Sequence, residues 1–319
     1  MRKKVAYSLI LLGIIMITAT GCGQSKAEKI TESKQQGIEL MNTGDYAGAI
    51  KSFDEALELQ GTNINEGTLD ICFYKAAALY NTGKSAEAID LYSAIIDFEP
   101  DLADTYYLRG SIYLKEKESE KMMADYEKAM ELADDPYEMA IMIYNNLSAN
   151  DYLSQGRTFL QEAIDLGGKK AEDYLGRGKV YISLTEYDKA VLELQKADEK
   201  KAEEAKIYLA QAYELQGKSQ EASKVLTKYL EEGNPSSEAF EALGNMEMKN
   251  NKPESALKYY QSGLNCNKVS NEQGLKKGEI IAYEKMGDYE NAKAKMAEYL
   301  EEYPGDAQAI RENEYLKTR

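Results

Sequence analysis

The chain has 319 residues, enough for two ordinary domains or one long repeat array. It contains no histidine, which excludes the commonest general base, the histidine-containing catalytic triads and every imidazole metal ligand. The formal net charge of −16 predicts a surface that repels nucleic acid and anionic polymers, so we expect no nucleic-acid partner.

The first residues carry the features of an export signal. Residues 1–4 (MRKK) are positively charged, and residues 5–19 form an apolar stretch of 15 residues. A bilayer-spanning helix needs roughly 20 residues, so this length favours the hydrophobic region of a signal peptide. The stretch ends in residues 19–22 (ATGC), which resemble a lipobox with Ala19 in place of the usual leucine. The resemblance implies a lipoprotein signal peptide over 1–21, cleavage after Gly21 and lipidation of Cys22.

Two alternatives to lipidation stay open, an ordinary cleaved signal peptide and an uncleaved membrane anchor. In the lipoprotein interpretation, two acyl chains on Cys22 are sufficient for stable anchoring. We then expect an extracytoplasmic, lipid-anchored protein of the cell membrane, or of the outer membrane if the host has one. Residues 22–29 are predicted to be a short polar tether. Without residues 1–21 the chain keeps 36 basic and 55 acidic residues, a net charge of −19.

The remainder of the chain repeats itself with a period near 34 residues. Repeats start near residues 30, 69, 103, 137, 171, 203, 237 and 273 and extend to 304. The eighth position of each repeat holds Gly37, Ala76, Gly110, Tyr144, Gly178, Ala210, Gly244 and Ile280. The twentieth position holds Ala49, Ala88, Met122, Gly156, Ala190, Ala222, Ala256 and Ala292. Small residues at these offsets allow two helices to approach to about 8–9 Å.

This pattern resembles the tetratricopeptide repeat (TPR). The resemblance implies an all-α solenoid of about eight helix pairs, wound as a right-handed superhelix, with residues 305–319 as a C-terminal capping helix. The breakers agree with it, because all five prolines fall at turns or repeat boundaries and four glycines fall at the turn between the two helices of a repeat, namely Gly44, Gly83, Gly217 and Gly287. A different α-solenoid and a long helical bundle are the alternatives.

Three features depart from the repeat pattern. The fourth repeat has the large Tyr144 at the eighth position and Gly156 at the twentieth, which predicts a splayed helix pair. The first interval is five residues longer than the period, which predicts a loop over residues 61–68. Cys72 and Cys266 lie five repeats apart, so we expect no disulfide between them.

The resemblance also implies a concave groove lined by positions 5, 9 and 12 of each repeat. An apolar, tyrosine-rich groove favours a protein or peptide partner with apolar anchors. The alternative is that these side chains pack between neighbouring first helices as core. The predicted groove residues are Phe73, Tyr80, Tyr107, Leu114, Ile141, Asn145, Leu175, Lys179, Ile182, Ile207 and Gln211.

Catalytic and cofactor signals are weak. Residues 176–179 (GRGK) resemble part of a phosphate loop but lack its Ser/Thr, its spacing and a preceding strand. We therefore expect no enzyme activity, cofactor or metal. The leading hypothesis is a lipid-anchored scaffold that binds proteins or peptides. The alternatives are a structural or chaperone-like subunit of an envelope assembly or secretion machine, and a glycan or solute binder.

Overall fold

A computed structural model describes residues 25–62, 64–202, 204–233 and 235–319. The predicted signal peptide, the cleavage point at Gly21 and the lipidation site Cys22 lie outside these residues. The described chain contains seventeen α-helices and no strands. The first eight are α1 (Lys26–Asn42), α2 (Tyr46–Gln60), α3 (Glu66–Asn81), α4 (Ser85–Phe98), α5 (Ala103–Lys115), α6 (Ser119–Leu132), α7 (Pro136–Ser148) and α8 (Leu153–Asp165). The others are α9 (Ala171–Ser183), α10 (Tyr187–Glu199), α11 (Ala205–Leu215), α12 (Ser219–Glu231), α13 (Ser237–Lys249), α14 (Pro253–Leu264), α15 (Glu272–Met286), α16 (Tyr289–Glu302) and α17 (Ala307–Leu316).

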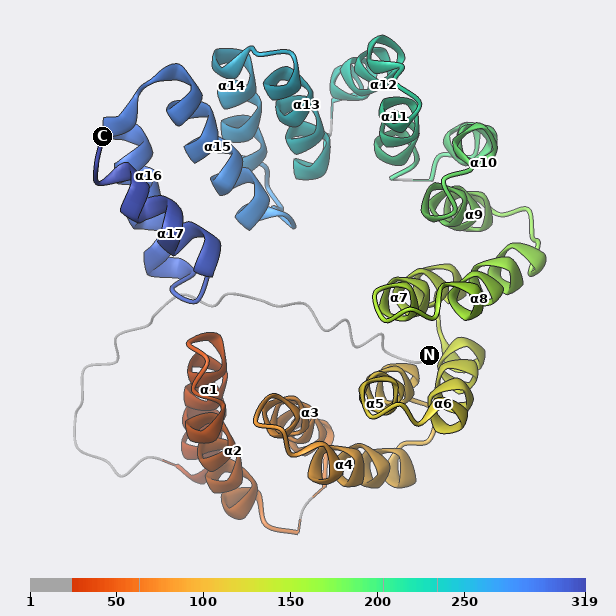
Figure 1. Ribbon diagram of the computed structural model, residues 1–319, viewed down its shortest axis with the longest axis vertical. Helices are drawn as coiled ribbons and strands as arrows, with labels where there is room; N and C mark the ends of the chain where they lie inside the picture. The colour runs from red at the N-terminus through yellow and green to blue at the C-terminus, as the bar shows by residue number, and fades with distance from the viewer. Residues whose placement is uncertain (1–24, 63, 203, 234) are drawn as a thin grey trace.

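Successive helix pairs follow one another around a ring (Figure 1). The first helices α3, α5, α7, α9, α11 and α15 lie on the inner side, and their partners lie on the outer side. The two ends of the array approach each other, because the backbone of Gly305, between α16 and α17, lies against the carbonyl of Asn42 at the end of α1. A side chain at position 305 would have no room there.

Small residues bring the two helices of a pair together, as the repeat pattern predicts. A Cβ on Gly178 would lie 2.5 Å from Cγ of Leu194, so the leucine occupies the space that glycine leaves. The ring of Phe53 fills the same space beside Gly37 in the first pair. Opposite these glycines, Ala49 and Ala190 are completely buried. The eighth and twentieth positions therefore set how closely each pair packs.

The predicted splaying of the fourth pair is wrong. A Cβ on Gly156 would lie 3.2 Å from the Cα of Tyr144, so α7 and α8 approach as closely as a glycine allows. In this repeat only the residue on the second helix is small. Because the two positions face each other, the glycine on α8 makes room for the backbone of Tyr144 on α7 and preserves the close approach.

Helix starts depart from the predicted boundaries near the N-terminus. Residues 26–29, predicted as tether, form the first turn of α1. The Ser25 hydroxyl accepts from the Glu28 N–H at 3.2 Å, and the Glu28 carboxylate accepts from the Ser25 N–H at 2.7 Å. This capping box starts the helix at Lys26, four residues before the predicted repeat start near residue 30. Asn65 caps α3 in the same way, so the predicted loop over 61–68 ends at residue 65.

The core runs along the array as a series of clusters, each shared between neighbouring pairs. The core of the described chain includes six buried tyrosines, and the hydroxyl groups of two of them hydrogen-bond as follows. Tyr260 donates to Oδ1 of Asn245 at 2.8 Å, and Tyr137 donates to the Gly167 carbonyl at 3.0 Å. Burial raises the pKa of Tyr260 to about 12. The buried tyrosines are Tyr92, Tyr113, Tyr126, Tyr137, Tyr260 and Tyr299.

Candidate functional site

The inner face of the ring is the candidate site. Positions 2, 5, 9 and 12 of a repeat follow the spacing i, i+3, i+7, i+10, which places them along one stripe of the first helix. Contacts between neighbouring repeats bear this out. Lys34, at the fifth position of the first repeat, pairs with Asp70, at the second position of the next. The stripes of the first two repeats therefore meet.

Ten of the eleven predicted groove residues keep exposed surface. Asn145 and Gln211 are exposed and point away from the core. The apolar members also pack against the core clusters, so core and surface roles are combined in the same side chains. The half-buried residues are Phe73, Tyr80, Tyr107, Ile141, Leu175, Lys179, Ile182 and Ile207.

Leu114 does not line the inner face. Only 3% of its surface is exposed, and it belongs to the core cluster that joins the third, fourth and fifth repeats. Tyr80 and Ile182 occupy position 12 of their repeats and stay half-buried, so the burial of Leu114 depends on its place in the array. The prediction for this residue is wrong because the spacing of the residues gives a direction on the helix but not the neighbour that fills it.

A polar network on α5, α6 and α7 continues the inner face. The amide of Asn146 donates to Oγ of Ser111 at 2.6 Å and to the Tyr126 hydroxyl at 3.0 Å. Tyr107 packs over Tyr126 with the ring centres 5.8 Å apart. Burial raises the pKa of Tyr107. The sequence analysis did not identify Ser111 or Asn146, although Ser111 occupies the ninth position of its repeat.

Lys179 is the most enclosed cation of this face. Its Nζ lies 3.1 Å from Glu204, 3.8 Å from Glu138 and 4.4 Å from the centre of the Tyr208 ring. Burial lowers the pKa of the lysine, but Tyr208 and Glu204 outweigh it and raise the pKa overall. The lysine was predicted as a groove residue, whereas its three partners were not. Glu138 and Glu204 could have been found, because acidic residues recur at the second position of successive repeats.

Comparisons with known proteins agree with the repeat pattern. Tetratricopeptide repeat models match residues 34–104, 103–136 and 280–306. Two Dictyostelium discoideum proteins, the DnaJ homolog subfamily C member 7 homolog and the member 3 homolog, are 27% and 29% identical over 107 residues. Each match covers 34% of this chain and 20% of the relative, so the chain spans about a fifth of these proteins. A tetratricopeptide repeat protein from Parabacteroides merdae is similar at 15% identity, with coverage of 80% of this chain and 99% of that one and a TM-score of 0.45.

The fold is an all-α solenoid of TPR repeats. The matched segments include the first three repeats and the last one, and the helix pairs between them continue the same arrangement. TPR repeats are protein-interaction modules, and no catalytic domain is indicated.

The residues of the phosphate-loop-like segment have structural roles in the TPR array. Gly176 and Gly178 are buried against Tyr137 and Leu194. Arg177 is 8% exposed, and its Nε donates to Glu193 at 2.7 Å. The same guanidinium donates to the carbonyls of the loop between α8 and α9. These contacts join two repeats and leave no groups for a phosphate.

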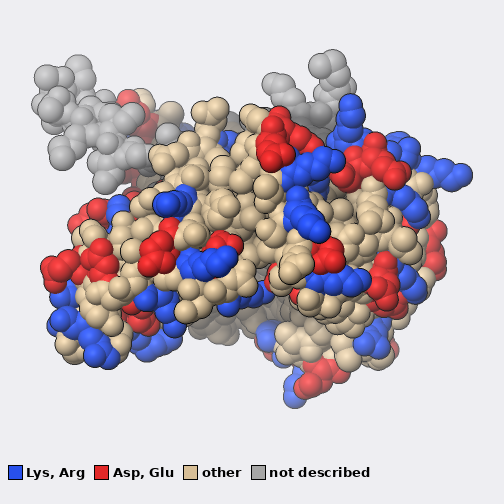
Figure 2. Space-filling view, turned by 90° about the horizontal axis from the view of Figure 1, so that it is seen from above, with Lys and Arg blue, Asp and Glu red and all other residues tan. Residues whose placement is uncertain are grey.

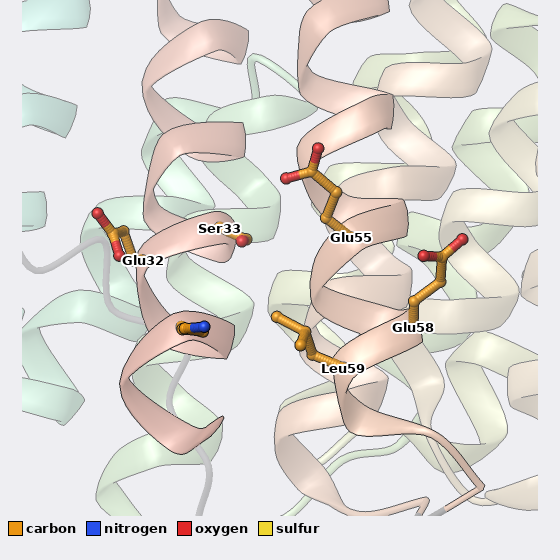
Figure 3. Close-up of a pocket in the computed structure, with 6 residues that line it drawn as sticks. Glu32, Ser33, Glu55, Glu58 and Leu59 are labelled. Carbon is orange, nitrogen blue, oxygen red and sulfur yellow. The ribbon is translucent and has the colours of Figure 1, made fainter. Parts of the chain in front are cut away.

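An open cavity of about 580 Å³ lies between α1 and α2 (Figure 3). Lys29, Glu32 and Ser33 line it from α1, and Glu55, Glu58 and Leu59 line it from α2. No earlier pair of the described TPR array packs here, which leaves the cavity open to solvent. Among the described residues, no group of three Cys, Asp or Glu side chains is placed to hold a metal ion.

Both described cysteines are free thiols and are half-buried. Burial raises the pKa of Cys72 and of Cys266, which keeps both thiols protonated and unreactive at neutral pH. No helix of the described residues has the length and apolar character that a membrane crossing requires. Viewed at its edge, the ring carries acidic and basic side chains side by side, with broad uncharged areas between them (Figure 2).

Proposed function

We propose that this protein is a lipid-anchored, extracytoplasmic scaffold that binds a protein or peptide on the inner face of its TPR ring. The observation that carries the binding proposal is that half-buried apolar and aromatic side chains recur at positions 5 and 12 of the inner helices from α3 to α11. Aromatic and aliphatic groups that keep exposed surface are the usual anchors of peptide recognition. The lipid anchor rests on the lipobox-like residues 19–22.

Two bulky substitutions test the inner face. The exposed Asn145 and Gln211 lie on the inner helices α7 and α11, so Asn145→Trp with Gln211→Trp obstructs the surface without removing a core contact. The full-length protein, purified from native envelopes in nonionic detergent, should recover a defined partner that this double variant loses. Gln161→Trp with Gln220→Trp, exposed on the outer helices α8 and α12, is the matched control. Equal recovery by both double variants would reject the inner face as the binding surface.

The anchor is tested independently at Cys22. Cells fed with labelled palmitate should label the wild-type protein and leave Cys22→Ser unlabelled, because the thiol is the acceptor of the diacylglyceryl group. The variant should also leave the membrane fraction. Labelled Cys22→Ser, or unlabelled wild type, would reject the lipoprotein assignment without affecting the binding proposal.

A further inference from the structure

Carboxylates recur along one edge of the inner face. The second position of the second to seventh repeats is acidic in every case. Because position 2 shares a stripe with positions 5 and 9, this row runs beside the half-buried apolar residues of the same helices. The row consists of Asp70, Asp104, Glu138, Glu172, Glu204 and Glu238.

Lysines of the chain neutralise only part of this row. Lys34 pairs with Asp70, and Lys179 lies between Glu138 and Glu204. Asp104 and Glu172 have no ion pair with any described lysine or arginine. Burial raises the pKa of Asp104, as expected for a carboxylate without a cation beside it. The inner face therefore combines apolar groups with unneutralised negative charge.

Lys179 shows what this surface accepts. Its ammonium group lies between two carboxylates that come from the repeats before and after its own, and it stacks on the face of Tyr208. Two carboxylates and an aromatic face form a complete cation-binding cage. The lysine side chain is 16% exposed, whereas those of Glu138 and Glu204 are 51% and 52% exposed. The carboxylates thus stay open to a second cation from outside.

We propose that the inner face binds a cationic amphipathic segment of a protein partner. In the absence of the partner, Lys179 occupies the cation cage formed by Glu138, Glu204 and Tyr208. The apolar side of the segment packs on Tyr107, Ile141, Leu175 and Ile207, which lie half-buried along the same stripe. Its lysine or arginine side chains lie along the carboxylate row. This proposal rests on the binding function proposed above and specifies the chemistry of the partner.

Lys179 then opposes binding, since it competes for the cage and repels the incoming cation. Lys179→Met keeps most of the aliphatic stem and removes the charge, so it should tighten binding of a cationic segment by about threefold to tenfold. Glu138→Gln with Glu204→Gln should weaken binding by a similar factor. Added salt should weaken binding to the wild type, because the attraction between exposed charges is screened.

The experiment uses the full-length protein in nonionic detergent and three synthetic helical peptides. The first contains leucine and lysine, the second has glutamate for lysine, and the third has serine for leucine. Fluorescence anisotropy should show binding of the leucine–lysine peptide only, tightened by Lys179→Met. The matched control is Lys206→Met. Lys206 also lies between two carboxylates, Asp198 and Glu232, and near a tyrosine ring, but these partners come from the outer helix α10 and the C-terminal end of the outer helix α12.

Two outcomes would overturn the proposal. Preferential binding of the leucine–glutamate peptide, weakened by Lys179→Met, would make Lys179 an anion-binding group while leaving the inner face as a binding surface. Binding of none of the peptides would reject a cationic amphipathic partner. The envelope experiment with the tryptophan variants decides separately whether the inner face binds a partner at all.

Discussion

The fourth and fifth repeats fill the same space with opposite chemistry. In the fourth, Ile143 on α7 and Phe159 on α8 occupy the seventh and twenty-third positions and are almost completely buried. In the fifth, Arg177 on α9 and Glu193 on α10 occupy these positions and form an ion pair of 2.7 Å. The two pairs nevertheless have the same antiparallel arrangement of helices.

The comparison separates two roles within a repeat. The eighth and twentieth positions set the approach of the helices and hold at least one small residue in each of the eight repeats, whereas the seventh and twenty-third positions hold an apolar pair in the fourth repeat and an ion pair in the fifth. Arg109 and Asp125 repeat the ion pair in the third repeat. The eighth repeat reverses the charges, with Glu279 on the first helix 4.0 Å from Lys295 on the second. The seventh and twenty-third positions are thus filled by an apolar pair in one of these repeats and by an ion pair of either orientation in the others.

Removing the apolar pair should have the largest effect. Phe159 is 1% exposed, so Phe159→Ala leaves a cavity in the core. We expect a loss of about 3–5 kcal/mol in the free energy of unfolding. Urea denaturation followed by circular dichroism measures it. Phe98→Ala, at a phenylalanine that is 47% exposed, is the control and should cost much less. Equal effects would show that the fourth repeat does not depend on this contact.

Breaking the ion pair on one side should come next. Arg177→Met leaves Glu193, whose side chain is 13% exposed, with only the exposed Lys196 as a cationic partner at 2.6 Å, and should cost about 2–3 kcal/mol. Arg177→Met with Glu193→Met should recover much of this loss, because an apolar pair replaces the ionic one as in the fourth repeat. The carbonyl of Gly167 still loses a donor, so recovery stays incomplete. A double variant less stable than the single one would contradict the equivalence of the two chemistries.

Changing the small residue should have a smaller but definite effect. Gly156→Ala places a Cβ 3.2 Å from the backbone of Tyr144, which cannot move as a side chain can, so we expect a cost of about 1–2 kcal/mol. At Gly67, in the first turn of α3, the nearest atom to an added Cβ is Oδ1 of Asn65, and alanine should not destabilise. Thermal denaturation compares the two variants. A stabilising Gly156→Ala would show that the fourth pair is looser than its neighbours.

The smallest predicted effect is a pH dependence of the C-terminal end. Burial and the nearby Glu312 raise the pKa of Glu284 to about 7, above its ordinary value of 4.5. Between these values the folded state binds a proton that the unfolded state does not, so the free energy of unfolding falls as the pH rises from about 5 to about 7. Glu284→Gln should flatten the dependence of the urea midpoint on pH in this range. The chain has no histidine that could titrate in this range. An unchanged pH dependence of the urea midpoint in Glu284→Gln would rule out Glu284 as its source.

Most of the fold follows from local and repeated features of the sequence. Small residues at fixed offsets predict pairs of helices, and proline at the first position of α7 and α14 fits a helix start. The errors arose where a cap started a helix before its apolar residues, as at Ser25, or where one residue compensated for the size of another, as Gly156 does for Tyr144. Each of these requires knowledge of which two groups face each other.

The sequence predicted only which side of each first helix contributes to the candidate site. Helical spacing placed ten of eleven groove residues on surfaces with exposure, but it could not show that Leu114 is covered or that Lys179 already has partners. The distances along the chain from Lys179 to Glu138 and to Glu204 are 41 and 25 residues, and neither equals the repeat period of about 34. The meeting of these three side chains depends on how three successive first helices are rotated and spaced.

The sequence by itself determined the all-α repeat architecture and the acidic character of the inner edge, because both arise from residues at a fixed period. Only the tertiary structure decided which carboxylates are neutralised, where a cation is held and how near the ends of the ring lie, as Asn42 and Gly305 show. These depend on contacts between distant segments. Such contacts are set by the crossing of helices and the direction of side chains, which a linear pattern does not specify.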